Sequence, residues 1–423
     1  MQRLSGGRNA LSSTFGALAL LVTGCGDAGD ASDTPDRIEP PRTVKATLQS
    51  RELNPQVDGR DLTTLVAGNT AFALNMFNRL RSSSQNVAVG PYSISQAMAM
   101  LYAGSRGVTE LELRSVLGFG VDATRVHPTF NGLDLELQSR NPDIFLRNAN
   151  QVWLDRGFAP LPEFLDVMTG DYGAPLAVVD FAGDAEAARS TINDWVSQVT
   201  EEKISELFPA GSIDGTTVLA LTNAMYMDAP WKYTFDAAAT RPAAFSLLDG
   251  SSVMVPMMHF NDFLPSAAGD AWQAVELPYR GDEVSMFVVV PEDLEAFEYS
   301  LTPARLDEII GAIRYGGIHL SMPRFSFRFH ASLIEQVTAL GLDSLSAPDL
   351  SGIAPGGLEV QSIEHEAFIE VDEEGTRAAA ATGVAVAESH GPTVSVDRPF
   401  VFFIVDKPTR SVLFLGHVVD PSR

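Results

Sequence analysis

Two kinds of hydrophobic pattern divide this chain, and their order limits the folds that it can adopt. Patterns with the 3.6-residue period of a helix occur mostly in the first half, whereas strand-like apolar runs occur mostly in the second half. No regular alternation of strand and helix runs through the sequence, so a doubly wound parallel sheet is not expected. The order predicts an α+β fold with large, mostly antiparallel sheets.

The same patterns locate the expected elements. Helical patterns run through Leu65, Phe72, Met76 and Leu80 and through Ser93–Leu101, Leu161–Met168, Ala185–Val199, Ala304–Ile313 and Ser332–Leu340. Strand-like runs lie at Val218–Met227, Val253–Met258, Ala271–Leu277, Val284–Val290, Ile363–Val371, Phe400–Val405 and Val412–Val419. The last two runs are predicted to form a β-hairpin, because a short turn containing Pro408 joins them. No repeat or second linker follows Asp61, so we expect one large domain over residues 61–423.

The first 24 residues have the pattern of an export signal. Arg3 and Arg8 precede an apolar stretch around Phe15 to Val22 that is too short for a comfortable membrane span. The sequence LVTGC resembles a bacterial lipobox, which predicts that Cys25, the one cysteine, is lipidated. A plain signal peptide with an incidental cysteine is the alternative. We therefore expect an exported protein, either a cell-envelope lipoprotein or an extracellular one.

Residues 25–60 have a different composition from the rest of the chain. Aspartates and prolines recur there and large apolar residues are few. Such a segment is predicted to be a disordered or extended linker.

The charge of the chain excludes some partners. The formal net charge is −25, and no Lys/Arg-rich run occurs, so nucleic acid is not an expected partner and heparin is disfavoured. The acidity is typical of a solvated, soluble surface.

Motifs for catalysis and for cofactors are missing from the sequence. The nearest approach to a nucleophile elbow is the stretch AGSRG, but the segment before it reads as a helix, so Ser105 is interpreted as a helix-exit residue. His365-Glu366 lacks the second histidine of a zinc protease motif, and the seven histidines are scattered. We expect no metal, no cofactor and no enzymatic activity.

One segment near the end, VDEEGTRAAAATGVAV, fits neither a stable helix nor an ordinary strand. Its alanine run is too short to hold a helix alone. With a period of two, Thr376, Ala378, Ala380 and Thr382 share one face, and all four are small. The pattern indicates a strand whose inward face must carry almost no side chain.

Several stretches, in this order, resemble the serpin family over roughly Asp61 to Arg423. They are NVAVGPYSISQAMAMLYAGSRGVTELELRSVLGF, LPEFLDVMTGDYGAPLAVVDF, INDWVSQVTEEKISELFP, LTNAMYMDAPWKYTFD, VELPYRGDEVSMFVVVPED, HEAFIEVDEEGTRAAAATG and DRPFVFFIVDKPTRSVLFLGHVVDP. The resemblance implies a central five-stranded sheet, two further sheets, about nine helices and an exposed reactive loop, at about 373–397. It also implies a protease inhibitor that acts as a suicide substrate: the cleaved loop inserts into the central sheet and traps the protease as an acyl-enzyme.

By this resemblance the alanine-rich segment is the hinge of an inhibitory serpin. The hinge residues are Glu373, Glu374, Gly375, Thr376, Arg377, Ala378, Ala379, Ala380, Ala381 and Thr382. Large inward side chains would overpack the core on insertion, and the small face avoids this. Arg377 falls on the opposite face, Gly375 is expected to supply unusual backbone dihedrals, and no proline lies between Glu373 and His390.

The resemblance also assigns residues that control opening of the sheet. Ser93, Asn223 and His365 match polar positions beneath the central sheet, and Trp231 matches a tryptophan near the point where the loop enters. Ordinary packing is an alternative for His365 and is compatible with the role of Trp231. Gly90 stands where the family commonly has serine, so the polar network is expected to lack one member.

The cleaved bond is predicted by counting along the loop. Counting forward from Glu373 places the residue on its acyl side at Ser389, and counting back from Pro399-Phe400 places it at Glu388. The bond is therefore Glu388–Ser389 or Ser389–His390, with Ala387–Glu388 as a third alternative.

The loop composition limits the target protease. No Lys or Arg lies between Ala378 and Asp397, so a trypsin-like target is not expected. The run from Val384 to Ala387 suits elastase- or subtilisin-like proteases, and a Glu-specific protease is the other option. The expected partner is a serine protease, with a cysteine protease as an alternative, and the inhibitor is expected to be a monomer. A non-inhibitory serpin that acts as a binding or structural protein is the alternative function.

Overall fold

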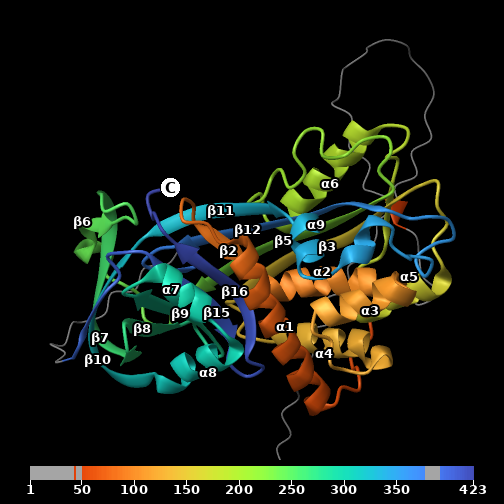
Figure 1. The fold of residues 1–423 in the computed structure, drawn as a ribbon. Helices are drawn as coiled ribbons and strands as arrows, with labels where there is room; N and C mark the ends of the chain where they lie inside the picture. The colour runs from red at the N-terminus through yellow and green to blue at the C-terminus, as the bar shows by residue number, and fades with distance from the viewer. Residues whose placement is uncertain (1–41, 44–49, 377–390) are drawn as a thin grey trace, which may run out of the picture. The chain divides into compact units, whose positions relative to one another are not determined.

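The computed structural model describes residues 42–43, 50–376 and 391–423, which all belong to one compact unit, residues 40–423. Within these residues the fold is α+β, as predicted, and Figure 1 shows its sheets and helices.

The central sheet contains the strands that form the site. Its strand order is β1-β4-β3-β5-β12-β11, and the short β13 pairs with β5. The strands are β1 (Arg42–Thr43), β3 (Phe145–Asp155), β4 (Ala177–Val179), β5 (Leu219–Pro230), β11 (Phe325–Ser332), β12 (Val360–Val371) and β13 (Gly375–Thr376). The pairs β3–β4 and β5–β12 are parallel and the other pairs are antiparallel. A parallel pair in the middle of the sheet can accept an antiparallel strand between its members.

The second sheet has the order β14-β10-β7-β8-β9-β15-β16-β2, with β6 paired to β7. Its strands are β2 (Val87–Val89), β6 (Arg241–Ser246), β7 (Ser252–Gly269), β8 (Trp272–Pro278), β9 (Val284–Pro291), β10 (Arg314–Pro323), β14 (Thr393–Ser395), β15 (Phe400–Asp406) and β16 (Ser411–Val418). The predicted terminal hairpin is confirmed as β15 and β16. The resemblance implied two further sheets, but β7 is continuous over 18 residues and pairs with β6, β10 and β8 in turn, so these strands form one sheet.

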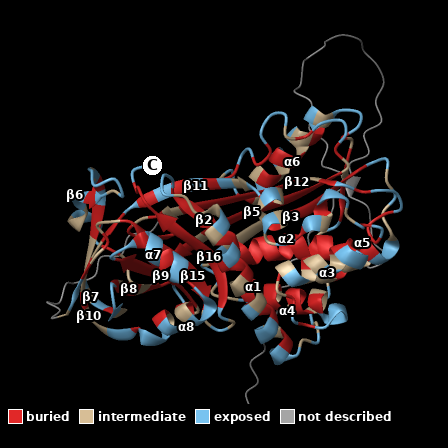
Figure 2. Ribbon diagram, in the orientation of Figure 1, coloured by how far each residue is buried: buried red, intermediate tan, exposed pale blue. Residues whose placement is uncertain are grey.

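Nine α-helices occur in the part of the chain that the structure describes. They are α1 (Gly59–Leu80), α2 (Pro91–Gly104), α3 (Gly107–Val116), α4 (Val126–Gln138), α5 (Pro162–Tyr172), α6 (Ala185–Val199), α7 (Leu294–Ser300), α8 (Pro303–Ala312) and α9 (Ile334–Ala339). Almost every residue of α2 is buried (Figure 2), because this helix packs beneath the central sheet. Ser105 caps its C-terminus and donates to Tyr102 O at 2.8 Å, as a helix-exit residue would.

Helix α6 covers the opposite, outer face of the central sheet. Asp184 caps its start by accepting from Ala187 N at 3.0 Å, and its apolar stripe, which includes Ile192 and Val196, packs on Trp153 and other outer-face residues of β3, β5 and β12. The central sheet therefore lies between α2 and α6, as Figure 1 shows. Any strand that enters this sheet meets packed side chains on both faces.

The folded part of the chain begins earlier than residue 61. Helix α1 starts at Gly59, and within the predicted linker Arg51 binds the Asn131 and Asp134 side chains, each at 2.7 Å. Residues 42–43 and 50–60, part of the predicted disordered or extended linker, are therefore attached to the folded domain. A few polar anchors and a helix cap hold this stretch, and composition does not reveal such contacts. Residues 1–41, with Cys25 and the predicted signal, lie outside the described residues.

Helices long and apolar enough to cross a membrane are absent from residues 42–43, 50–376 and 391–423.

Candidate functional site

The candidate site is the seam between β5 and β12, the parallel neighbours in the middle of the central sheet. Their ladder runs from Leu219 and Val360 to Tyr226 and Phe368. β5 then continues to Pro230 and β12 to Val371, but the pairing between the two strands ends at Tyr226 and Phe368. We call the residues beyond this point the mouth of the seam, and the stretch around Asn223 and His365 its closed end.

The chain that leaves β12 turns back immediately at the mouth. The Asp372 side chain accepts hydrogen bonds from Glu374 N at 2.8 Å and Gly375 N at 3.2 Å, and Asp372 N donates to Gly375 O at 3.0 Å. After this turn, Gly375 and Thr376 pair antiparallel with the last residues of β5. The first part of the predicted hinge therefore already runs in the direction that a strand inserted between β5 and β12 requires.

Gly375 has a different role from the one predicted. Its φ does not lie in the left-handed region, so the expectation of unusual dihedrals is wrong. A Cβ at this position would lie 2.3 Å from Ala229 O and 2.8 Å from Pro230 Cα. Glycine is needed here because the backbone approaches β5 closely.

Glu373 fixes the start of the hinge. The residue is 4% exposed, and its side chain accepts hydrogen bonds from Arg324 and Thr240. Burial alone would raise the pKa of the Glu373 carboxyl, but these hydrogen bonds outweigh it, and the pKa lies below its usual value. Glu373 O and Glu374 O also accept from Phe235 N and Trp231 N at 2.9 and 2.8 Å.

Trp231 lies at the mouth, as the resemblance implies. Its indole stacks on Tyr279 with 4.5 Å between ring centroids, and its Nε1 donates to Asp372 O at 3.0 Å. The Tyr279 hydroxyl is 2.6 Å from the hydroxyl of Thr376, which is 2% exposed. Thr376 therefore points to the inner face of the sheet, as the period-two pattern predicted, and little space surrounds it.

The three polar residues predicted beneath the sheet meet at the closed end of the seam. Asn223 Nδ2 donates to Ser93 Oγ at 2.6 Å, and Asn223 Oδ1 bonds His365 Nδ1. All three residues are fully buried. Because Asn223 belongs to β5 and His365 to β12, their hydrogen bond crosses the seam and must break before another strand can pass.

A fourth member of this network, Asn150, was not predicted. Its Oδ1 accepts from Asn223 Nδ2 at 2.6 Å and from Ser93 Oγ at 3.0 Å, and its Nδ2 donates to Ser93 O at 3.1 Å. Asn150 lies on β3, which pairs with β5 so that Asn150 is opposite Asn223. The network therefore joins three adjacent strands and α2.

Gly90 adds no side chain to the network, but its backbone takes part. Gly90 N donates to His365 Nε2 at 3.3 Å, so the backbone supplies the bond. A Cβ at Gly90 would lie 2.6 Å from the Met225 sulfur, so any larger residue there would require the Met225 side chain to move.

His365 is neutral at physiological pH. Burial, with a smaller effect from His330, lowers its pKa from 6.5 to about 3. Since Nε2 accepts from Gly90 N, the proton of the neutral ring is on Nδ1 and is donated to Asn223 Oδ1. A second proton on Nε2 would face the Gly90 N–H and break this contact.

Carboxylates gather at the mouth. Burial raises the pKa values of Asp228, Glu370 and Asp372, and neighbouring carboxylates raise them further. No group of three or more His, Cys, Asp or Glu residues in the described part of the chain has the arrangement of a metal site.

The rest of the predicted site lies outside the described residues. This applies to hinge residues Arg377, Ala378, Ala379, Ala380, Ala381 and Thr382 and to the candidate reactive-bond residues Ala387, Glu388, Ser389 and His390.

Comparison with known proteins gives a consistent family assignment. A family model described as serpin (serine protease inhibitor) matches residues 67–421. The chain is 31% identical to an uncharacterized serpin-like protein of Methanosarcina mazei over 421 residues, which cover 96% of each protein. It is 36% identical to the human leukocyte elastase inhibitor over 377 residues, which cover 84% of this chain and 99% of that protein.

A solved structure has the same fold. The structure of human thyroxine-binding globulin complexed with thyroxine aligns with a TM-score of 0.80 and 26% identity, covering 85% of this chain and 99% of that one.

Proposed function

This chain belongs to the serpin family of serine protease inhibitors, and we propose that it inhibits its target as a suicide substrate. Serpins are inhibitors rather than enzymes, and the family is known for insertion of the reactive loop into the central sheet. The observation that carries the proposal is the antiparallel pairing of Gly375–Thr376 with the end of β5. The first hinge residues already lie where an inserted strand would begin.

The proposed reaction starts as ordinary proteolysis. The protease serine oxygen attacks the carbonyl carbon of the loop residue, the peptide C–N bond breaks, and the new amine leaves with the proton that the protease histidine delivers. The loop remains on the protease as an ester. Its free hinge then extends the β13 pairing along β5 and carries the acyl-enzyme away from the entry point before water can hydrolyse the ester.

The chemistry of the seam supports fast insertion. Thr376 already occupies the inner face, and the sequence that follows it places only small side chains on that face. Each inserted residue gains backbone hydrogen bonds on both sides, which stabilises the inserted form. Competition between insertion and hydrolysis decides whether the chain is an inhibitor or a substrate.

Denaturing electrophoresis tests this function. The full chain is incubated with pancreatic elastase, subtilisin, a Glu-specific endopeptidase and trypsin, and complexes that survive denaturation are counted per inhibitor consumed. We expect a covalent complex with one of the first three and none with trypsin, because no Lys or Arg lies between Ala378 and Asp397. Cleavage of the loop by every protease without a complex would overturn the proposal.

The same reactions identify the cleaved bond. The mass of the peptide released from the C-terminal side distinguishes Ala387–Glu388, Glu388–Ser389 and Ser389–His390. Release after Glu388 would favour a Glu-specific target, whereas release after Ala387 would favour an elastase-like one.

A binding or structural role is the second candidate, because the solved protein reported above with this fold is complexed with thyroxine. Such a protein would be cleaved without forming a complex, and its unfolding temperature would not rise after cleavage. A sharp rise after cleavage would instead indicate insertion and favour the inhibitor.

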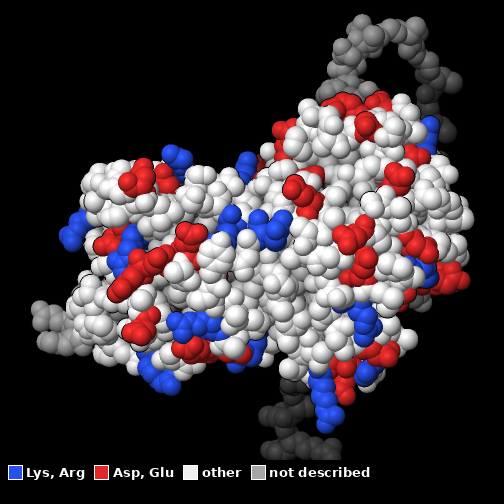
Figure 3. Space-filling view, viewed as in Figure 1, with Lys and Arg blue, Asp and Glu red and all other residues white. Residues whose placement is uncertain are grey.

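We also propose that the inhibitor is exported as a monomer and anchored by acyl chains on Cys25. Radiolabelled palmitate should be incorporated into the expressed full-length chain and not into its Cys25→Ser variant. A polyanionic cofactor such as heparin is not part of the proposal. On the face that Figure 3 shows, Lys and Arg side chains lie scattered among acidic ones.

A further inference from the structure

The hydrogen-bond network at the closed end of the seam continues away from it through α2. Asn150 Nδ2 donates to Gln96 Oε1 at 2.8 Å, and Gln96 Nε2 donates to the Tyr92 hydroxyl at 3.3 Å. The Tyr92 hydroxyl in turn donates to Asp134 Oδ1 at 2.7 Å, on α4. An unbroken chain of side chains therefore leads from the β5–β12 seam to another layer of the molecule.

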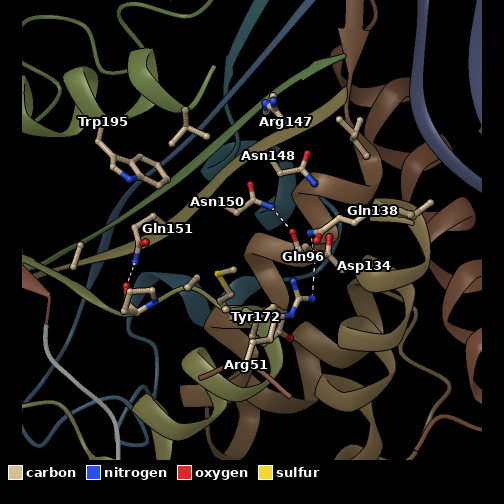
Figure 4. Close-up of a pocket in the computed structure, with 18 of the residues that line it drawn as sticks. Arg51, Gln96, Asp134, Gln138, Arg147, Asn148, Asn150, Gln151, Tyr172 and Trp195 are labelled. Atoms are coloured by element: carbon tan, nitrogen blue, oxygen red, sulfur yellow. Dashed lines mark hydrogen bonds and ion pairs between the residues drawn. The ribbon is translucent and has the colours of Figure 1, made fainter. Parts of the chain in front are cut away.

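The outer end of this chain lies at a cavity of about 580 Å³ between α2, α4, α5, α6 and β3. There Asp134 Oδ2 accepts a hydrogen bond from Gln138 Nε2 and forms an ion pair with Arg51, each at 2.7 Å. Figure 4 shows Asn150 pointing toward Gln96 on one side and Asp134, Gln138 and Arg51 gathered on the other. Two hydrogen bonds and an ion pair thus hold Asp134 in one orientation.

The three residues that follow Asn150 along this chain are deeply buried. Tyr92, Gln96 and Asp134 are 1%, 5% and 6% exposed. Burial, and then the Asp134 charge, raises the pKa of Tyr92 well above its usual value. The hydroxyl therefore stays protonated and donates a hydrogen bond to the carboxylate. Buried polar groups that lose a partner are costly, so each member of the chain holds its neighbour in place.

We infer that Tyr92, Gln96 and Asp134 form a positioning arm that holds Asn150 in the rotamer required by the seam network and so sets how readily the seam opens. The inference deepens the proposed function, on which it rests, by assigning control of insertion to residues that do not touch the seam.

The role of Asn150 explains how the arm acts. Its amide oxygen accepts from Ser93 and Asn223, and this orientation is fixed because its amide nitrogen donates to Gln96. If Gln96 loses its acceptor on Tyr92, it can rotate away, and the Asn150 amide is then free to turn. The β3–β5 side of the network would loosen although none of its own residues had changed.

Helix α2 provides a matched pair of substitutions. Tyr92→Phe removes the hydroxyl that joins Gln96 to Asp134. Tyr102→Phe removes the other buried tyrosine hydroxyl of the helix, which has no hydrogen-bond partner among the described residues. Asp134→Asn keeps an acceptor for Tyr92 without the charge and should have an intermediate effect.

Hydrogen exchange of the intact, full-length chain is the measurement. In Tyr92→Phe, amides of residues 219–226 and 360–368 should exchange about tenfold faster than in the wild type, the factor expected from loss of a hydrogen bond to a charged group. Amides of β15 and β16 should keep their rates, which distinguishes positioning of the seam from a general loss of stability. The rate at which inhibitory activity disappears on incubation without protease should rise in parallel.

The outcomes separate this inference from the proposed function. Equal seam exchange in Tyr92→Phe and Tyr102→Phe, or faster exchange everywhere in Tyr92→Phe, would overturn the arm even if the wild type inhibits. Failure of the wild type to form any covalent complex would overturn the proposed function, and the exchange ratio would still decide whether the arm exists.

Discussion

At its mouth the seam is held by an ion pair that reaches solvent, whereas its closed end is held by neutral groups that water does not reach. Arg324, which binds Glu373 at the mouth, has a side chain that is 43% exposed. Asn223 and His365 at the closed end are fully buried and hydrogen-bonded to each other. The two strands β5 and β12 are therefore easily separated by an incoming strand at the mouth of the seam and firmly joined at its closed end.

This difference indicates where the barrier to insertion lies. The first hinge residues have already paired with β5, so entry requires little rearrangement. Passage farther along must separate the ladder from Tyr226 and Phe368 onward and break the Asn223–His365 bond within it. The mouth should accordingly control whether the strand can enter, and the closed end how fast it proceeds.

The largest expected effect is at the mouth. Thr376→Arg places a long side chain on the inner face, where the threonine is buried against Tyr279. Overpacking costs about 1–3 kcal/mol, which slows insertion by a factor of about 5 to 150. The variant should be cleaved without forming a covalent complex, as electrophoresis with the target protease will show. Thr63→Arg, on the exposed face of α1, is the control, and retained inhibition by Thr376→Arg would contradict this hinge.

The second prediction uses pH, because His365 and the carboxylates at the mouth respond to acid in opposite directions. Between pH 6.5 and about 3 the unfolded chain binds a proton at His365 that the folded chain excludes, so the free energy of unfolding falls as pH falls. From pH 7 to 5 this loss is about 2 kcal/mol. The raised pKa values of Asp228, Glu370 and Asp372 have the opposite sign, since there the folded chain binds protons first.

Urea unfolding of the wild type and of His365→Gln at pH 7 and 5 isolates the contribution of the closed end. The variant should lose less stability than the wild type on acidification, and His319→Gln on β10 should behave like the wild type. An identical pH dependence in all three proteins would show that His365 does not carry the acid response.

The smallest effect is expected from the ion pair at the mouth. Glu373→Gln removes the charge that Arg324 and Thr240 bind, and the unfolding free energy should fall by about 1 kcal/mol, because the pair is partly exposed. Urea midpoints of this variant and of Glu359→Gln, an exposed position before β12, give the comparison. If Glu373→Gln lowered the free energy of unfolding as much as disruption of the closed end does, the mouth would hold the seam as firmly as the closed end.

The sequence patterns located the elements whose burial is regular. Helix α6 has the predicted bounds, Ala185–Val199, because its apolar stripe lies on one side only. β3 was missed because Arg147, Asn148, Asn150 and Gln151 interrupt its apolar pattern. Those polar residues line the cavity, and Asn150 joins the seam network. The strand and the unpredicted site residue thus escaped detection for the same reason.

The hinge shows a second limit of prediction from sequence. Gly375 was identified correctly but assigned to backbone dihedrals, whereas the structure shows that Ala229 O leaves no room for a Cβ. A close approach between two backbones depends on tertiary pairing, which no local pattern records. The Tyr92–Gln96–Asp134 arm was also invisible, because its members are separated in sequence and each resembles an ordinary helix residue.

The glycine at position 90 has a consequence for measurement. A serine hydroxyl could turn to another acceptor, but the Gly90 N–H is fixed in the backbone and reaches His365 Nε2 only while β12 stays in place. Its deuterium uptake would therefore time the fluctuations of the sheet directly. The exchange rate of this one amide would report how often β12 moves away from β5, which is the motion that trapping of a protease requires.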